Sequence, residues 1–141
     1  MNDGEFTDTN IAVYAHDGSA GPKRAVARNL IARLWRDGHG VLSVQVLSEF
    51  YTTCIRKGIP AEEVRRRVGR FSGWQVHSPT ERDVLAAIEL SQRFQLSFWD
   101  AMIVRSAQAT GARILWTEDL QDGQRFGDVV VRNPFAGVAT R

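Results

Sequence analysis

Thr7-Asp8-Thr9-Asn10 closes the first strand-like stretch of the chain, which covers residues 4–8. Taken alone, Asp and Asn after an extended segment are ordinary turn residues. Three later acids share this placement, because each lies near a predicted strand-to-helix junction or in the early turns of a helix: Glu49, Asp100 and Asp119. In an open α/β sheet the site lies beyond the carboxyl ends of the strands, near a topological switch point. We therefore expect the fold to gather these four carboxylates at one edge of a sheet.

Strand-like and helix-like stretches alternate along the chain. We expect the first strand to continue loosely through Ile11, Val13 and Tyr14. Short apolar runs predict further strands at residues 41–44, 74–77, 114–117 and 128–131. Apolar spacing and local start signals predict helices that begin near Pro22, directly after Val44, and near Pro60, Thr80 and Ser97. Such alternation predicts an α/β fold with a mainly parallel sheet covered on both faces.

Composition places the chain among globular proteins. With 43% hydrophobic and 24% charged residues, 141 residues suffice for one domain with a buried core, which we expect over residues 1–135, followed by a tail over 136–141. A net charge of +2 does not by itself indicate a nucleic-acid-binding protein. Cys54 is the only cysteine, so an internal disulfide and a Cys-rich zinc site are excluded. Since no apolar stretch resembles a signal peptide or a membrane span, we expect a cytoplasmic protein without a membrane partner.

Each of the four acids also has a simpler explanation: a turn for Asp8 and Asp119, a solvated helix face for Glu49, and a helix cap for Asp100. These separate explanations give no reason for all four to fall near one edge. Four carboxylates in one pocket would repel one another and raise one another's pKa values. A hard divalent cation such as Mg²⁺ or Mn²⁺ removes that cost, lowers the pKa of bound water and stabilises charge on a phosphoryl oxygen. The pattern predicts hydrolysis of a phosphodiester.

Four segments together resemble the motifs of the PIN domain, and within it the VapC toxins of bacterial toxin–antitoxin pairs: Asp8-Thr9-Asn10, Ser48-Glu49-Phe50, Ser97-Phe98-Trp99-Asp100-Ala101 and Thr117-Glu118-Asp119-Leu120. The similarity runs from about Phe6 to Phe135. The resemblance implies a three-layer α/β/α domain and a Mg²⁺- or Mn²⁺-dependent endoribonuclease that cleaves RNA. The implied acidic quartet is Asp8, Glu49, Asp100 and Asp119, supported through hydrogen bonds by Asn10 and Thr117. The resemblance further implies a cognate VapB antitoxin over the cleft and a homodimer.

The sequence departs from the family pattern after Thr117. Many members place two aspartates two residues apart there, whereas here Glu118 and Asp119 are adjacent and the next acid is Asp122. Asp119 is our choice for the fourth ligand, and Asp122 is an outside candidate. Arg105 also stands in a helix where small apolar residues are common in relatives, which bears on packing or on the dimer face.

Other functions remain as alternatives. The chain could be a PIN-like module that grips RNA or a protein without cutting, although the presence of all four acids argues against a dead nuclease. An aspartate-nucleophile phosphatase would need an acid where Asn10 stands. A Rossmann cofactor site lacks its glycine fingerprint. The basic stretch between Arg56 and Arg70 is either an RNA track or a dock for an acidic antitoxin segment, or else a solvated helix face.

Overall fold

The computed structural model describes residues 3–138, and these form a mixed sheet with helices around it. The strands are β1 (Glu5–Thr7), β2 (Gly40–Ser43), β3 (Gln75–His77), β4 (Ile114–Trp116), β5 (Arg125–Phe126) and β6 (Val129–Arg132). Their order in the sheet is β3-β2-β1-β4-β6-β5, and every neighbouring pair is parallel except β5 with β6. The expected α/β fold with a mainly parallel sheet is confirmed. The short antiparallel strand β5 was not expected from the sequence.

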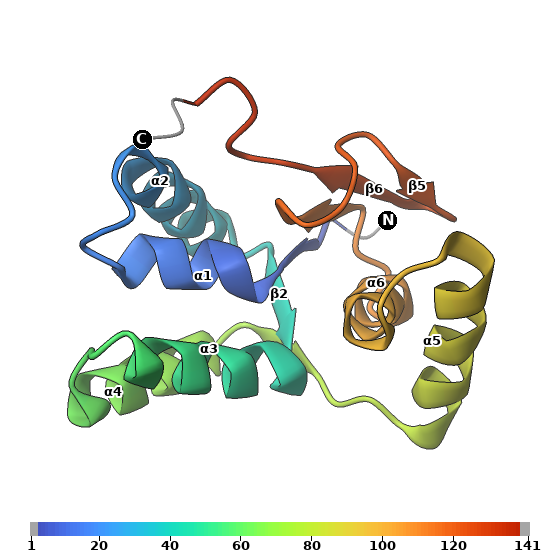
Figure 1. The fold of residues 1–141 in the computed structure, drawn as a ribbon, viewed down its shortest axis with the longest axis horizontal. Coiled ribbons are helices and arrows are strands. Elements are labelled where there is room, and N and C mark those ends of the chain that lie inside the picture. Colours follow the sequence, from blue (N-terminus) through green and yellow to red (C-terminus); the bar gives the residue numbers. More distant parts are fainter. Residues whose placement is uncertain (1–2, 139–141) are drawn as a thin grey trace.

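The helices are α1 (Thr9–His16), α2 (Pro22–Asp37), α3 (Val44–Arg56), α4 (Ala61–Phe71), α5 (Glu81–Phe94) and α6 (Phe98–Ala109). Helices α1 to α4 lie together at one end of the molecule, at left in Figure 1, and α5 and α6 lie as a pair at the other end. All residues of β1 and β2 are buried, although alternate residues point to opposite faces of the sheet. Both faces are therefore covered, which gives three layers.

The expectation that the first strand continues through Ile11 and Val13 is wrong. Helix α1 begins at Thr9, and Asp8 caps it, because an oxygen of the Asp8 carboxylate accepts a hydrogen bond from the Thr9 backbone amide at 2.7 Å. Ile11 and Val13 are buried, and so are Ala12 and Ala15. A short helix that is buried on most sides has no polar face, so its periodicity cannot be distinguished from that of a strand.

Local start and stop signals place the other helices as expected. Pro22 lies in the first turn of α2, and Gly38 ends that helix in the left-handed conformation with φ of 72°. Thr80 and Asp83 form a capping box at the start of α5. At the start of α6 the Ser97 hydroxyl accepts a hydrogen bond from the Asp100 amide at 3.1 Å. This bond fixes the first turn of α6, in which Asp100 lies.

The apolar residues that mark α5 in the sequence do not lie in the core. Val84, Leu85 and Ile88 are exposed by 37%, 65% and 40%, while Ala87 of the same helix is buried. Tyr51 and Ile55, at the edge of the apolar stripe of α3, are exposed as well. Helices α3 and α5 thus keep these apolar side chains on the molecular surface.

The core runs through the whole described chain. Cys54 is free and buried within it, as expected of a small core residue. Phe135 is buried, and Val138, in the segment expected as a tail, packs against the core. Residues 139–141 of that tail lie outside the described residues. Within residues 3–138, no helix has the length and apolar character that a membrane crossing requires.

Candidate active site

The site lies where the chain reverses its direction across the sheet. After β1 the chain builds β2 and β3 on one side, and it then crosses back through α5 and α6 to place β4 on the other side. Thr7 pairs with Trp116 in the register of β1 and β4, so Asp8 and Thr117 are the next residues on neighbouring strands. The Thr117 hydroxyl donates a hydrogen bond to Oδ2 of Asp8 at 2.8 Å. Asp8 is thereby held at the switch point between β1 and β4.

Asp119 is brought to the same place by the turn after β4. The Asn10 amide nitrogen donates to Oδ2 of Asp119 at 2.9 Å and lies 3.4 Å from the Thr117 hydroxyl. The backbone amide of Asp119 in turn donates to the Thr117 hydroxyl at 3.1 Å. Thr117 and Asn10 therefore connect the carboxylates of Asp8 and Asp119, which lie more than a hundred residues apart in the sequence.

Glu49 reaches the site from α3 and is held by two residues that the sequence did not single out as supports. The Thr9 hydroxyl donates to Oε1 of Glu49 at 2.7 Å, and the Gln45 amide nitrogen donates to Oε2 at 3.1 Å. The same Gln45 nitrogen donates to the carbonyl oxygen of Trp99 at 3.2 Å. Gln45 thus joins α3 to the first turn of α6, next to Asp100. Its position one helical turn before Glu49 was the available signal.

The four carboxylates act on one another through their charges. Burial raises the pKa of Asp8 to about 7, and the hydrogen bonds from Thr117 and Thr9 oppose that rise, whereas the charges of Asp119 and Glu49 add to it. Burial also raises the pKa of Asp100; the Ser97 hydrogen bond opposes this, and Asp119 and Glu49 again add to it. Within residues 3–138, no Lys, Arg or His forms an ion pair with any of the four acids. Their negative charge is not neutralised by the protein.

The donor set suits a hydrated divalent cation. No group of three Asp, Glu, His or Cys side chains in the described part of the chain is already arranged as a metal site. The side-chain oxygens of Asn10 and Gln45, beside the acids, are buried acceptors without a hydrogen-bond partner. Mg²⁺ keeps several waters and binds one or two carboxylates directly. A cation of this kind, with bound water as the donor to the remaining oxygens, fits these residues.

The remaining acids near the motif have structural partners. Asp122 is exposed, and its carboxylate accepts a hydrogen bond from the Asn133 amide at 2.9 Å, at the end of β6. Glu118 accepts a short hydrogen bond from the Tyr14 hydroxyl and forms an ion pair with Lys23 at 2.7 Å. The structure therefore brings Asp119 to the other acids, whereas Asp122 is bonded to the end of β6.

Arg105, which we expected to bear on packing or on the dimer face, has a partner inside the molecule. Its Nε donates to Oδ1 of Asp83 at 2.8 Å. Asp83 is only 4% exposed and also accepts from the Thr80 amide and contacts the His77 ring. Arg105 therefore joins α6 to the start of α5. The capping box of Thr80 and Asp83 is part of a polar network that also includes Arg105 and His77.

Comparisons with known proteins bear on the fold and the family of this chain. The family model for the PIN domain matches residues 6–125. Among solved structures, a toxin–antitoxin complex from Klebsiella pneumoniae is similar with a TM-score of 0.71 at 19% identity, over 92% of this chain and 97% of that one. VapC20 of Mycobacterium tuberculosis, a sarcin–ricin loop cleaving toxin, gives a TM-score of 0.65 at 22% identity, over 81% of this chain and 90% of that one.

VapBC2 from Rickettsia felis, bound to a DNA fragment from its promoter, gives a TM-score of 0.65 at 21% identity, over 92% of this chain and 97% of that one. These likenesses concern the fold. A comparison with curated proteins gives no significant sequence match. The family model covers most of the described chain, from β1 to β5, and includes all four acids. This chain belongs to the PIN domain family.

Proposed function

We propose that this protein is a metal-dependent endoribonuclease of the VapC type, in which Asp8, Glu49, Asp100 and Asp119 hold Mg²⁺ or Mn²⁺. One observation carries the proposal: carboxylates from the residue after β1, from α3, from α6 and from the turn after β4 share one electrostatic site that no basic side chain of the described chain neutralises. When bound, the cation would lower the pKa of a water and stabilise charge on a phosphoryl oxygen.

The protein's own residues would orient this site. Each oxygen of Asp8 accepts one hydrogen bond, from the Thr9 amide and the Thr117 hydroxyl, which fixes the plane of the carboxylate and leaves lone pairs for a ligand. Asp119 is exposed and Asp100 is half-buried, so they lie where a phosphodiester can approach. Asn10 would position Asp119, and Gln45 would position Glu49.

The partners follow from the same assignment. We propose an RNA substrate and a VapB-like antitoxin, because two of the similar structures are described as toxin–antitoxin or VapBC complexes. We also propose a homodimer, because Val84, Leu85 and Ile88 of α5 leave apolar surface uncovered in the single chain. Sedimentation of the purified protein tests the dimer, and a monomer at micromolar concentration would exclude it.

The central test is cleavage of RNA by Asp8→Asn and Asp100→Asn, with Asp128→Asn as the matched control on an exposed aspartate. We expect the first two to lose cleavage and the control to keep it, with unchanged circular dichroism for all three. Asp122→Asn separates the two candidates for the fourth ligand, because we expect it to cleave normally while Asp119→Asn does not. Cleavage retained by both Asp8→Asn and Asp100→Asn would refute the nuclease.

A second candidate is a PIN-like module that binds RNA or a protein without cutting. The observation in its favour is that no three acids in residues 3–138 are preassembled as a metal site. Calorimetric titration with Mg²⁺ and Mn²⁺ separates the two. Absence of binding at millimolar metal would favour the module, and binding that Asp8→Asn abolishes would favour the nuclease.

A further inference from the structure

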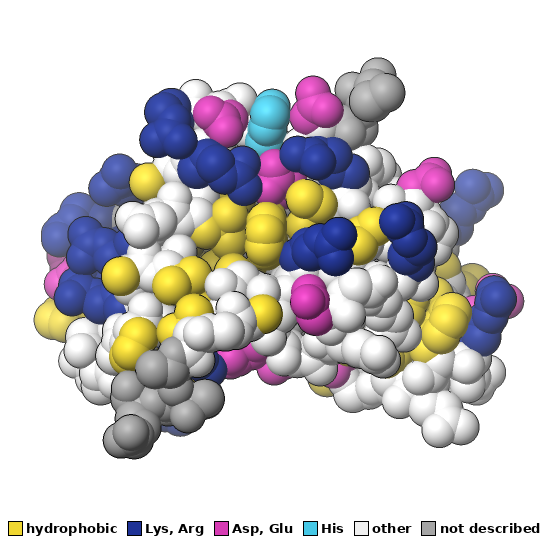
Figure 2. All heavy atoms as spheres, turned by 90° about the horizontal axis from the view of Figure 1, so that it is seen from above, with side chains coloured by type: hydrophobic (Ala, Val, Ile, Leu, Met, Phe, Trp, Pro, Cys, Tyr) yellow, Lys and Arg dark blue, Asp and Glu magenta, His cyan; other side chains and the backbone are white. Residues whose placement is uncertain are grey.

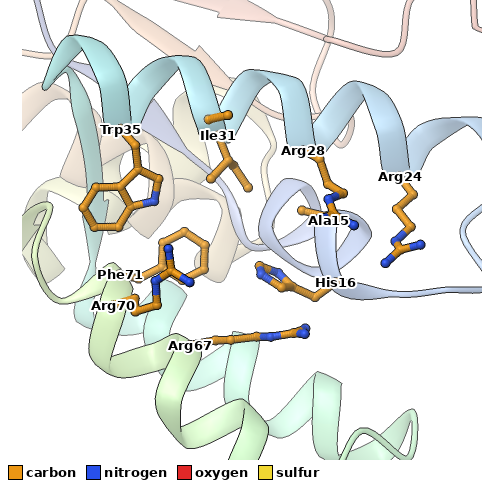
Figure 3. Close-up of a pocket in the computed structure, with 10 residues that line it drawn as sticks. Ala15, His16, Arg24, Arg28, Ile31, Trp35, Arg67, Arg70 and Phe71 are labelled. Atoms are coloured by element: carbon orange, nitrogen blue, oxygen red, sulfur yellow. The ribbon is translucent and has the colours of Figure 1, made fainter.

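A concave site lies between α1, α2 and α4, and none of the four acids lines it. It is a cavity of about 330 Å³, within the range of small-ligand sites. Arg24 and Arg28 project into it from α2, and Arg67 and Arg70 approach from α4 on the opposite side, as Figure 3 shows. Lys and Arg side chains gather at this end of the molecule, at left in Figure 2.

The positive charge of this pocket is largely unpaired. Arg67 forms an ion pair with Glu63 through Nη2, but its Nη1 is buried and has no hydrogen-bond partner. Within residues 3–138, no carboxylate forms an ion pair with Arg24, Arg28 or Arg70. Like charges spaced three or four residues apart on one helix destabilise it, and here two helices face each other with such pairs. An anion between them would remove this repulsion.

His16 also lines the pocket, and the positive charges of Arg67 and Arg28 act on its ring. Its ring lies 5.9 Å from the Phe71 ring, and Nδ1 lies 2.8 Å from the Ala12 carbonyl oxygen. Burial lowers the pKa of His16, and the charges of Arg67 and Arg28 lower it further. Guanidinium groups from both helices therefore act on one ring, which places them around a common space rather than on separate solvated faces.

One end of the pocket is aromatic. Trp35 is 40% exposed, and its indole is held edge-to-face against Trp74 at a centroid distance of 5.7 Å. Phe71 and Ile31 are buried and form the apolar wall beside it. An exposed, fixed indole next to guanidinium groups is the combination that proteins use to stack a nucleobase while holding its phosphate.

We propose that this pocket binds a nucleotide, with the phosphate among Arg24, Arg28 and Arg67 and the base against Trp35. A phosphate offers three or more oxygens, which guanidinium groups from two helices can share through paired hydrogen bonds, whereas a single carboxylate satisfies one such group. The nucleotide is either a free mononucleotide or one unit of an RNA strand. The proposal does not depend on the nuclease, because binding is measured without metal.

The experiment is calorimetric titration of the Asp8→Asn protein in the presence of a chelator. The probes are inorganic phosphate, adenosine monophosphate, a short oligoadenylate and a poly-glutamate peptide. We expect Arg28→Gln and Arg67→Gln each to weaken binding of the monophosphate at least about tenfold. Arg82→Gln, on the exposed face of α5, is the matched control and should bind as the parent does. Trp35→Leu should weaken the monophosphate about fivefold or more while leaving inorganic phosphate unchanged.

The outcomes separate the sources of the phosphate. Equal affinity for monophosphate and oligoadenylate would assign a free nucleotide, and a tenfold preference for the oligoadenylate would assign an RNA strand. Three results would overturn the proposal: no binding of any phosphate probe, binding that neither arginine substitution weakens, or tighter binding of the acidic peptide than of both nucleotides. Circular dichroism of each variant shows whether the fold is kept, and Arg28→Gln, which breaks no ion pair, guards against loss of fold in Arg67→Gln.

Discussion

Asp8→Asn should stabilise the metal-free protein at alkaline pH while it destroys cleavage. The pKa of Asp8 is raised to about 7 in the folded chain, from the ordinary value of 3.8 for an aspartate. Because the pKa of Asp8 is higher in the folded state than in the unfolded state, its protonation stabilises the folded protein. This stabilisation is fully present below pH 4 and is lost as the pH rises through 7. At 1.36 kcal/mol per pKa unit, ionisation of Asp8 costs the folded state about 4 kcal/mol.

Asn can keep much of the local structure, since it is also a good N-cap residue and its side-chain oxygen can still accept from the Thr9 amide or the Thr117 hydroxyl. We therefore expect Asp8→Asn to unfold with a free energy about 2 to 4 kcal/mol above that of the wild type at pH 8, falling to about half of that or less at pH 5. Urea denaturation at both pH values, with a chelator present, measures the difference. Asp128→Asn is the control and should follow the wild type.

Added Mg²⁺ gives the complementary measurement. A ligand that binds only the folded state stabilises it by mass action, so Mg²⁺ at pH 8 should raise the stability of the wild type but not that of Asp8→Asn. The reasoning would be refuted if the stability difference between the two proteins were the same at pH 5 and pH 8. It would also be refuted if Asp8→Asn were the less stable protein at pH 8.

Two further predictions concern supporting residues. Arg105→Met should lower the free energy of unfolding by about 2 kcal/mol at pH 7, since it leaves buried Asp83 without its guanidinium partner, while Arg82→Met should leave it unchanged. Because hydrogen bonds with the Thr80 amide and with Arg105 lower the pKa of Asp83 to about 2, the loss should disappear as the pH falls from 4 towards 2 in thermal melts. Gln45→Leu should weaken Mg²⁺ binding about 10- to 100-fold in calorimetry with the fold intact, because Glu49 and the Trp99 carbonyl lose their common donor; unchanged affinity would show that this bond does not orient the site.

The fold was predictable where short stretches carry their own signals. Pro22 and Gly38 bound α2, and Thr80 with Asp83 caps α5, because these are interactions within one turn of the chain. Helix α1 was misread because its burial removes the polar face that reveals helical periodicity. Strand β5 has only two residues and is defined by its antiparallel pairing with β6. A local sequence pattern of two residues does not predict such a pairing.

The gathering of the candidate acids could be anticipated from the sequence, and the family resemblance implied the supports Asn10 and Thr117, but the supports of Glu49 were not singled out. The acids follow strand ends or helix starts, and parallel strands bring such positions to one edge. Thr9 and Gln45 hold Glu49 through side-chain contacts, one of them across 40 residues. The bond between Arg105 and Asp83 likewise spans 22 residues between two helices. The contacts of Thr9 with Glu49 and of Arg105 with Asp83 depend on how helices pack, which the spacing of residue types does not specify.

The contacts of Glu118 connect Phe135, near the C-terminal end of the described chain, to the turn that carries Asp119. Lys23, the ion-pair partner of Glu118, lies over the rings of Tyr14 and Phe135, and those two rings meet edge-to-face at 5.2 Å. Phe135 therefore packs against Tyr14 and Lys23, the two side chains that bind Glu118 next to Asp119. A version of the chain shortened to end before Phe135 would keep all four acids and yet remove the ring that packs against Tyr14 and Lys23, beside the turn that carries Asp119.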